Sequence, residues 1–140
     1  MGVDYADLIR QAFAVRKMAY TPYSGFMVGA ALLTADGRVY PGCNIENAAY
    51  SPTNCAERTA FFKAVSEGER HFIAIAVVGG PSGVEEGEFS FVFPCGLCRQ
   101  VMAEFCGGDF VIAVAKSPEE YKTYTLAELL PERFGPEDLE

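Results

Sequence analysis

The chain has 140 residues, half of them hydrophobic, and carries a formal net charge of −8 at pH 7. This length suits one domain with a buried core, so we expect a single domain over residues 1–140. The acidic balance and the lack of any Lys and Arg cluster argue against a nucleic-acid partner. No apolar run reaches the roughly 18 residues of a membrane span and no signal peptide is visible, so we expect a cytoplasmic protein without a membrane partner.

The N-terminal part of the chain predicts a helix followed by a hairpin. Apolar residues recur every three or four positions over residues 4–20, which is typical of an amphipathic helix with Asp4 as its N-cap. Residues 26–33 and 39–44 are extended segments on either side of Asp36-Gly37, a dipeptide favoured in tight turns. These two segments predict the first two strands.

Helices and strands alternate in the middle of the chain. Residues 54–67 are rich in helix formers and stop at a glycine, which predicts a second helix. Residues 72–78 form a short apolar run that predicts a buried strand, and residues 79–90 read as a loop. A third helix that follows Pro94 and runs through Phe105 comes next, and then a fourth strand over residues 110–115.

The last strand should run antiparallel to the one before it. Only residues 116–120 separate strand-like residues 121–125 from the fourth strand, and a parallel crossover needs a dozen or more residues. Thr125 and Glu128 have the spacing of a capping box that opens a short helix, which Pro131 ends. We therefore expect an α/β fold of three layers, α/β/α, with a mixed five-stranded sheet.

Three of the five cysteines lie at predicted helix starts. The odd number without an export signal favours metal ligands or buried thiols over disulfides. Cys95 and Cys98 form a Cys-x-x-Cys pair, which by itself fits a redox dithiol, a structural zinc site or a catalytic zinc site. Cys55 begins another helix and is followed by Glu57, so we expect two helix N-termini to converge on one metal ion.

Three protein ligands leave the fourth position of a tetrahedral zinc for water, which distinguishes a catalytic site from a closed structural site. Three thiolates and one divalent ion sum to a net charge of −1, which the helix ends and Arg58 could offset. A closed site would need Cys43 or Cys106, but neither belongs to a paired motif and both read as buried thiols. His71, the one histidine, has no metal-ligand spacing to another candidate.

Glu57 has a structural alternative to a catalytic role. It stands three residues after Asn54, so it could act as the capping partner of Asn54 at the start of the second helix. Sequence spacing alone does not separate these two roles.

The segment Cys55-Ala56-Glu57, followed about forty positions later by Pro94-Cys95-Gly96-Leu97-Cys98, resembles the motif of the small homotetrameric zinc-dependent cytidine deaminases. Further segments resemble family signatures in the same order and cover nearly the whole chain: Tyr20-Thr21-Pro22-Tyr23-Ser24, Val28-Gly29-Ala30-Ala31-Leu32, Gly42-Cys43-Asn44-Ile45-Glu46-Asn47-Ala48, Cys98-Arg99-Gln100 and Glu128-Leu129-Leu130-Pro131.

The resemblance implies hydrolytic deamination of cytidine and deoxycytidine to uridine and deoxyuridine plus ammonia, an activity of pyrimidine salvage. In this class of enzyme one zinc ion per chain, held by Cys55, Cys95 and Cys98, supplies the hydroxide that attacks C4. Glu57 is implied to be the catalytic residue, which takes a proton from the water and delivers protons to N3 and to the departing amino group.

Substrate-binding residues are also implied by the resemblance. Asn44 and Glu46 would bind the ribose hydroxyls, Phe26 would pack against the pyrimidine, and Ala56 would line the site. Phe134 matches a C-terminal phenylalanine that closes the pocket of a neighbouring subunit, so a homotetramer is implied. From the residues alone, a core position is favoured for Phe26, and solvated positions at a strand end are favoured for Asn44 and Glu46. Tyr50 fits either a subunit boundary or the core.

Two other functions remain open. Within the enzymes, a deaminase of a modified cytosine nucleoside such as blasticidin S would share the zinc motif. Outside them, a zinc-stabilised or redox dithiol protein would also use Cys95 and Cys98. Residues 79–93 are longer and more acidic than in compact members of the family, which puts the substrate range in doubt.

Overall fold

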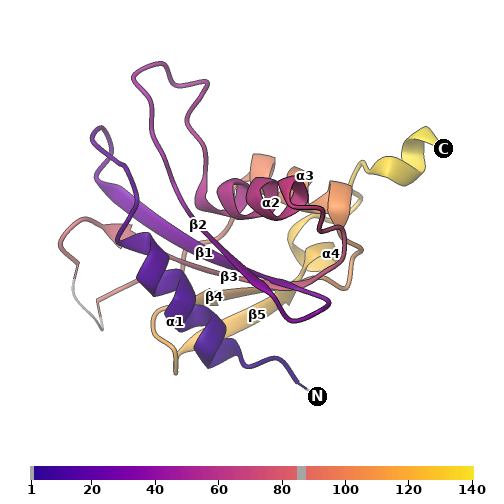
Figure 1. Ribbon diagram of the computed structural model, residues 1–140, viewed down its shortest axis with the longest axis horizontal. Coiled ribbons are helices and arrows are strands. Elements are labelled where there is room, and N and C mark those ends of the chain that lie inside the picture. Colours follow the sequence, from indigo (N-terminus) through magenta and orange to yellow (C-terminus); the bar gives the residue numbers. More distant parts are fainter. Residues whose placement is uncertain (1, 85–87) are drawn as a thin grey trace.

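The computed structural model describes residues 2–84 and 88–140, so part of the predicted loop 79–90 lies outside the described residues. Five strands form one sheet in the order β2-β1-β3-β4-β5, with α1 on one face and α2 and α3 on the other (Figure 1). The elements are α1 (Tyr5–Arg16), β1 (Phe26–Thr34), β2 (Val39–Cys43), α2 (Ala56–Ser66), β3 (Phe72–Pro81), α3 (Gly96–Phe105), β4 (Val111–Ala115), β5 (Tyr121–Thr125), α4 (Leu126–Leu129) and the 3-10 helix η1 (Pro136–Leu139). The predicted three-layer α/β/α fold is confirmed.

The strand directions also agree with the prediction. β1 runs antiparallel to both β2 and β3, whereas β3 and β4 are parallel neighbours that pair Ala76 with Ala113. β5 runs antiparallel to β4, as the short connection between them requires. The capping box at the start of α4 is confirmed, because Thr125 accepts from the Glu128 amide while the Glu128 carboxylate accepts from the Thr125 amide.

The first helix is shorter than predicted. Asp4 caps it by accepting a hydrogen bond from the Asp7 amide, but the helix ends at Arg16 and not near residue 20. Tyr20 instead pairs with the segment after β2, donating its amide hydrogen to the Asn44 carbonyl at 3.0 Å. A tertiary backbone pairing therefore outcompetes the helical periodicity of residues 17–20.

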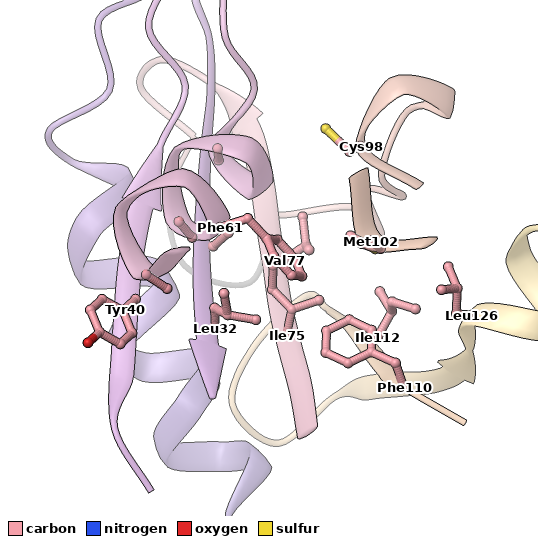
Figure 2. Packing of buried hydrophobic residues seen from close by; sticks show 14 of the residues in the cluster. Leu32, Tyr40, Phe61, Ile75, Val77, Cys98, Met102, Phe110, Ile112 and Leu126 are labelled. Carbon is pink, nitrogen blue, oxygen red and sulfur yellow. The ribbon is translucent and has the colours of Figure 1, made fainter. Parts of the chain in front are cut away.

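Buried side chains alternate between the two faces of the sheet because successive strand residues point in opposite directions. The cluster under α2 and α3 holds large residues such as Leu32, Phe61, Ile75 and Ile112, which Figure 2 shows packed together. The cluster under α1 is built largely from alanines, among them Ala74 and Ala76. The same strands thus present a bulky face and a small-residue face.

Two glycines allow the helices to approach the sheet closely. A Cβ atom at Gly29 would lie 2.0 Å from the Ala12 carbonyl oxygen of α1. A Cβ atom at Gly42 would lie 2.5 Å from the Ala60 nitrogen of α2. Each glycine therefore sets the distance of one helix from its face of the sheet.

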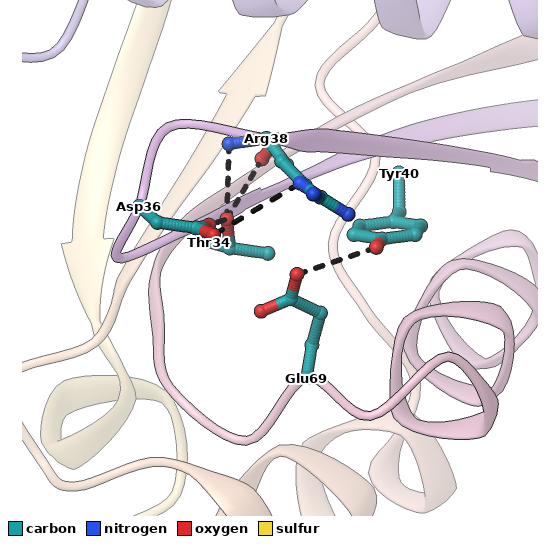
Figure 3. Close-up of polar contacts among 5 residues, drawn as sticks. All are labelled: Thr34, Asp36, Arg38, Tyr40 and Glu69. Atoms are coloured by element: carbon teal, nitrogen blue, oxygen red, sulfur yellow. Dashed lines mark hydrogen bonds and ion pairs between the residues drawn. The ribbon is translucent and has the colours of Figure 1, made fainter.

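A polar corner joins the β1–β2 hairpin to the end of α2 (Figure 3). The Thr34 hydroxyl donates to the Asp36 carboxylate and accepts from the Arg38 amide, which fixes the predicted Asp36-Gly37 turn. The Tyr40 hydroxyl donates to the Glu69 carboxylate at 3.3 Å. These bonds hold β2 against the helix that begins at the candidate metal site.

Other described boundaries also differ slightly from the sequence prediction. β3 continues to Pro81, three residues past Val78, because it remains paired with β1 as far as Phe26. α2 begins at Ala56, two residues later than predicted.

In the part of the chain that the structure describes, no helix is both long and apolar enough to cross a membrane.

Candidate active site

Three thiols meet where α2 and α3 begin. The ligand atoms of Cys55, Cys95 and Cys98 all lie within 4.8 Å of one another. The Sγ atoms of Cys55 and Cys95 are 3.7 Å apart, and those of Cys95 and Cys98 are 3.5 Å apart. Sulfurs bound at about 2.3 Å to a tetrahedral zinc stand about 3.8 Å from each other, so the donor set fits zinc.

The topology explains why these distant cysteines converge. α2 leads into β3 and α3 leads into β4, and these two strands are parallel neighbours. The two helices therefore lie side by side on one face of the sheet, with their N-termini at the same end (Figure 1). Cys55 and Cys95 are the N-caps of these helices, so the positive ends of both helix dipoles meet at the thiols.

The surroundings favour a thiolate at Cys55. Hydrogen bonds from Cys98 and from the Arg58 guanidinium lower the pKa of the Cys55 thiol to about 5. The pKa of Cys98 is raised, because this thiol donates its proton to Cys55 and burial disfavours its charged form. A metal ion would take the place of the shared proton, since thiolates are the ligating form.

Glu57 is buried beside the thiols. Its side chain is only 4% exposed, and its charge interacts with those of Cys55 and Cys98. Burial raises the pKa of Glu57 to about 7. The capping alternative is wrong, because Cys55 is the N-cap without a side-chain capping bond and the Asn54 amide group donates to the Thr59 hydroxyl.

The Arg58 guanidinium lies next to the Cys55 thiol. Its Nη2 atom donates to the Cys55 Sγ atom at 3.3 Å, and this bond is the main cause of its raised pKa. Its Nε atom is buried and has no hydrogen-bond partner within the described residues. The guanidinium is therefore held next to the negative charge that three thiolates would leave around a divalent ion.

Asn44 and Glu46 are brought close to the thiol group by a backbone bridge. Ile45 and Asn54 exchange two hydrogen bonds of 2.9 Å, so the segment after β2 runs beside the residue that precedes Cys55. The Asn44 side chain accepts from the Val28 amide and donates to the Phe26 carbonyl, both at 2.8 Å. Asn44 therefore also fixes the start of β1, where Phe26 lies.

Sequence reasoning missed the partners of Glu46. This carboxylate accepts hydrogen bonds from the amides of Tyr23 and Ser24 and from the Ser24 hydroxyl. The hydrogen bonds with Ser24 and Tyr23 lower the pKa of Glu46. The segment Tyr20 to Ser24 carried a family signature, but nothing in its composition pointed to Glu46. A cavity of about 360 Å³ opens here, lined by Glu46 and five neighbours.

The other predicted site residues differ in exposure. Phe26 is 37% exposed, Phe134 is 59% exposed and Tyr50 is 84% exposed, so the alternative of a core position is wrong for both Phe26 and Tyr50. Ala56 is completely buried as the first residue of α2. In this structure Phe134 lies on the C-terminal segment beyond α4.

Cys43, Cys106 and His71 stand apart from the thiol group. Burial raises the pKa of both Cys43 and Cys106, to about 12 for Cys106. Neither cysteine belongs to the group of potential metal ligands found among residues 2–84 and 88–140. His71 is exposed just before β3. Neither Cys43 nor Cys106 therefore supplies the fourth sulfur that a closed site with four thiolates would need.

A second cavity, of about 440 Å³, lies on the α1 side of the sheet. Arg16 lines it, but the Arg16 guanidinium already donates to the carbonyls of Met27, Gly80 and Pro81. Lys116, another lining residue, is 3.8 Å from the Glu120 carboxylate. No thiol lines this cavity, whereas the candidate metal ligands lie on the opposite face of the sheet.

Comparison with known proteins agrees with this geometry. The family model for the cytidine and deoxycytidylate deaminase zinc-binding region matches residues 3–114. A cytidine deaminase from Sporosarcina psychrophila is 53% identical over 137 residues, which cover 98% of this chain and 96% of that protein. The crystal structure of a cytidine deaminase from Burkholderia pseudomallei has a TM-score of 0.81 and 45% identity, covering 91% of this chain and 97% of that one.

A deaminase of another compound is less similar. A blasticidin-S deaminase from Bacillus cereus is 33% identical over 108 residues, which cover 76% of each chain. The family model, the closely similar cytidine deaminases and the three converging cysteines agree with one another. The chain therefore belongs to the family of zinc-binding cytidine and deoxycytidylate deaminases.

Proposed function

We propose that this protein is a zinc-dependent cytidine deaminase, which hydrolyses cytidine and deoxycytidine to uridine and deoxyuridine plus ammonia. One observation carries the proposal: three thiols within 4.8 Å of one another adjoin a carboxyl group that is only 4% exposed. The names of the most similar relatives point to the same substrate.

Cys55, Cys95 and Cys98 would hold the zinc ion. When bound, zinc acts as a Lewis acid that lowers the pKa of water toward neutrality. The helix N-termini and Arg58 stabilise the negative charge of the thiolates. The bound ion would displace the proton that Cys98 keeps in its absence.

Glu57 would move the protons. A carboxyl group with a pKa near 7 both accepts and releases protons at neutral pH, as general acid–base catalysis requires. Glu57 takes one proton from the attacking water and gives it to N3 of the ring. It takes the second proton as the C4 carbonyl forms and delivers it to the exocyclic nitrogen. The C4–N bond breaks, ammonia leaves and the carboxylate is restored.

Asn44 and Glu46 retain the capacity to bind ribose hydroxyls. A carboxylate offers about four acceptor positions. Tyr23 and Ser24 use three of those of Glu46, so one is left for a hydroxyl donor. The Asn44 amide group donates one of its two hydrogens to the Phe26 carbonyl, and the other remains available to a ligand. Phe26, partly exposed beside them, would pack against the pyrimidine ring.

We further propose a cytoplasmic homotetramer of single-domain chains that acts in pyrimidine salvage. The C-terminal segment extends away from the body of the chain (Figure 1) and exposes Phe134, which suits a contact with the pocket of a neighbour. Light scattering coupled to size-exclusion chromatography should give a mass about four times that of the 15.2 kDa chain. A monomer at working concentration would contradict the shared pocket.

The substrate can be tested directly. Purified protein should contain about one zinc per chain, and the ultraviolet spectrum of cytidine should convert to that of uridine. A parallel assay of deoxycytidine, cytosine, cytidine monophosphate and blasticidin S should show preference for the two nucleosides. Faster turnover of blasticidin S would instead support the modified-nucleoside alternative, and a metal-free protein that reduces disulfides would overturn the proposal.

A further inference from the structure

A side-chain hydrogen bond ties the C-terminal segment, residues 131–140, to the body of the chain, where the Arg133 side chain also packs beside Gly108. The Gln100 Nε2 atom donates a hydrogen bond of 2.8 Å to the main-chain carbonyl of Phe134. Within the described part of the chain, the other hydrogen bonds of this segment are internal, from Gly135 to Asp138 and back. Phe134 itself is 59% exposed and is not held by the core.

The anchoring residue lies on the helix that carries two of the thiols. Gln100 is two residues beyond Cys98 in α3. Its neighbour Arg99 forms hydrogen bonds both before Cys95 and at the origin of the C-terminal segment. Arg99 donates to the Pro94 carbonyl at 2.7 Å, just before Cys95, and to the Leu129 carbonyl at 2.6 Å, at the end of α4. The first turns of α3 therefore fix both the thiol group and the origin of the C-terminal segment.

We propose that Gln100 is a positioning residue for catalysis, which holds Phe134 in the place from which it closes a nucleoside pocket. This inference rests on the proposed function, in which Phe134 closes the pocket of a neighbouring subunit. Without this hydrogen bond, the less restrained segment around Phe134 would have to lose more conformational freedom each time a substrate is enclosed. Because the closing ring binds the substrate and the transition state alike, its loss should raise KM and leave kcat unchanged.

The test compares Gln100→Met with Gln11→Met. Methionine keeps the length of glutamine but cannot donate a hydrogen bond, and Gln100 is exposed, so the variant should fold normally. Gln11 is a matched control, because its amide group donates to Asp7 at 3.0 Å on α1, across the sheet from the thiols. Gln100→Met should raise KM for cytidine about fivefold, the size expected for one neutral hydrogen bond, with kcat and zinc content unchanged.

A double variant separates positioning from a general disturbance. If Gln100 acts through Phe134, adding Gln100→Met to Phe134→Ala should raise KM no further. The same fivefold increase in both backgrounds would overturn the proposal, as would an unchanged KM in the single variant.

A readout without substrate keeps the inference independent of the proposed activity. Hydrogen–deuterium exchange of residues 131–140 should be faster in Gln100→Met and unchanged in Gln11→Met. Equal exchange in the wild type and Gln100→Met would show that the anchor is absent in solution. Failure of the wild type to deaminate cytidine would refute the proposed function alone, and the exchange rates would still decide whether Gln100 holds the segment.

Discussion

The two faces of the sheet differ in the size of the side chains that the strands present to the helices. Toward α1 the strands present mainly alanines, and the helix lies close enough that Gly29 cannot carry a side chain. Toward α2 and α3 they present Leu32, Ile75, Val77 and Ile112, which support Phe61 (Figure 2). The candidate metal ligands lie only on this second face.

The size of the side chains on the second face explains how the thiols are positioned. Large interlocking side chains fix α2 and α3 relative to the sheet, because packing at crystal-like density leaves little room for the helices to shift. The ring of Phe61, for example, lies beside those of Phe72, Phe105 and Phe110, with centroids 5.1 to 6.2 Å away. Changes on this face should therefore alter the metal site, and changes on the α1 face should alter stability alone.

The largest effect should come from a ligand itself. In Cys98→Ser the softer sulfur is replaced by a poorer zinc ligand, so we expect most of the zinc and nearly all deamination to be lost. Cys106→Ser is the control, because Cys106 lies outside the thiol group. Metal analysis of both purified proteins decides the matter, and equal zinc content in the two would rule out Cys98 as a ligand.

The next effect should leave the metal in place. Glu57→Gln keeps the shape of the buried side chain but cannot carry a proton, so kcat should fall about 10³-fold while zinc stays at one per chain. Steady-state rates and zinc stoichiometry measured on the same sample test this. Normal turnover with a full complement of zinc would remove Glu57 from the mechanism.

A matched pair of core truncations compares the faces directly. Phe61→Ala and Ile9→Ala each empty a fully buried position, on opposite faces of the sheet. We expect losses of about 3–5 kcal/mol for the phenylalanine and about 2–5 kcal/mol for the isoleucine. Only Phe61→Ala should also weaken zinc binding, seen in calorimetry as a smaller rise of Tm on adding zinc. An equal rise in both variants would contradict the division between the faces.

The smallest expected effect on the metal site comes from adding one methyl group on each face. Gly42→Ala must push α2 outward and Gly29→Ala must push α1 outward, and because each methyl group meets main-chain atoms, the cost should reach or exceed the about 1–3 kcal/mol that is typical of overpacking. Gly42→Ala should lower zinc affinity, measured by competition with a chelating dye, whereas Gly29→Ala should not. Loss of affinity in both would mean that the sheet transmits the strain between its faces.

Local chemistry made much of the fold predictable. The Asp36-Gly37 turn, the capping box at Thr125 and the short link before β5 each restrict the chain within a few residues. The end of α1 was predicted wrongly, because it depends on the pairing of Tyr20 with Asn44, which no local pattern reveals.

The candidate site was predictable where its chemistry is unusual. Cysteines at the start of two helices indicated thiolates that share one metal ion, and the structure brings the three sulfurs together. The carboxylate of Glu46 shows the opposite case, since its bonds to Ser24 join residues 22 positions apart and follow from the folded loops alone. The same holds for the bond from Gln100 to Phe134, 34 positions away.

The paired hydrogen bonds between Ile45 and Asn54 close the long β2–α2 connection at its base. Lengthening or shortening the chain beyond this point changes the closure entropy only slowly. Insertions or deletions between Ala48 and Pro52 would therefore leave the start of α2 where it is. Evolution or engineering could therefore add new contacts in this loop without changing the positions of the candidate metal ligands.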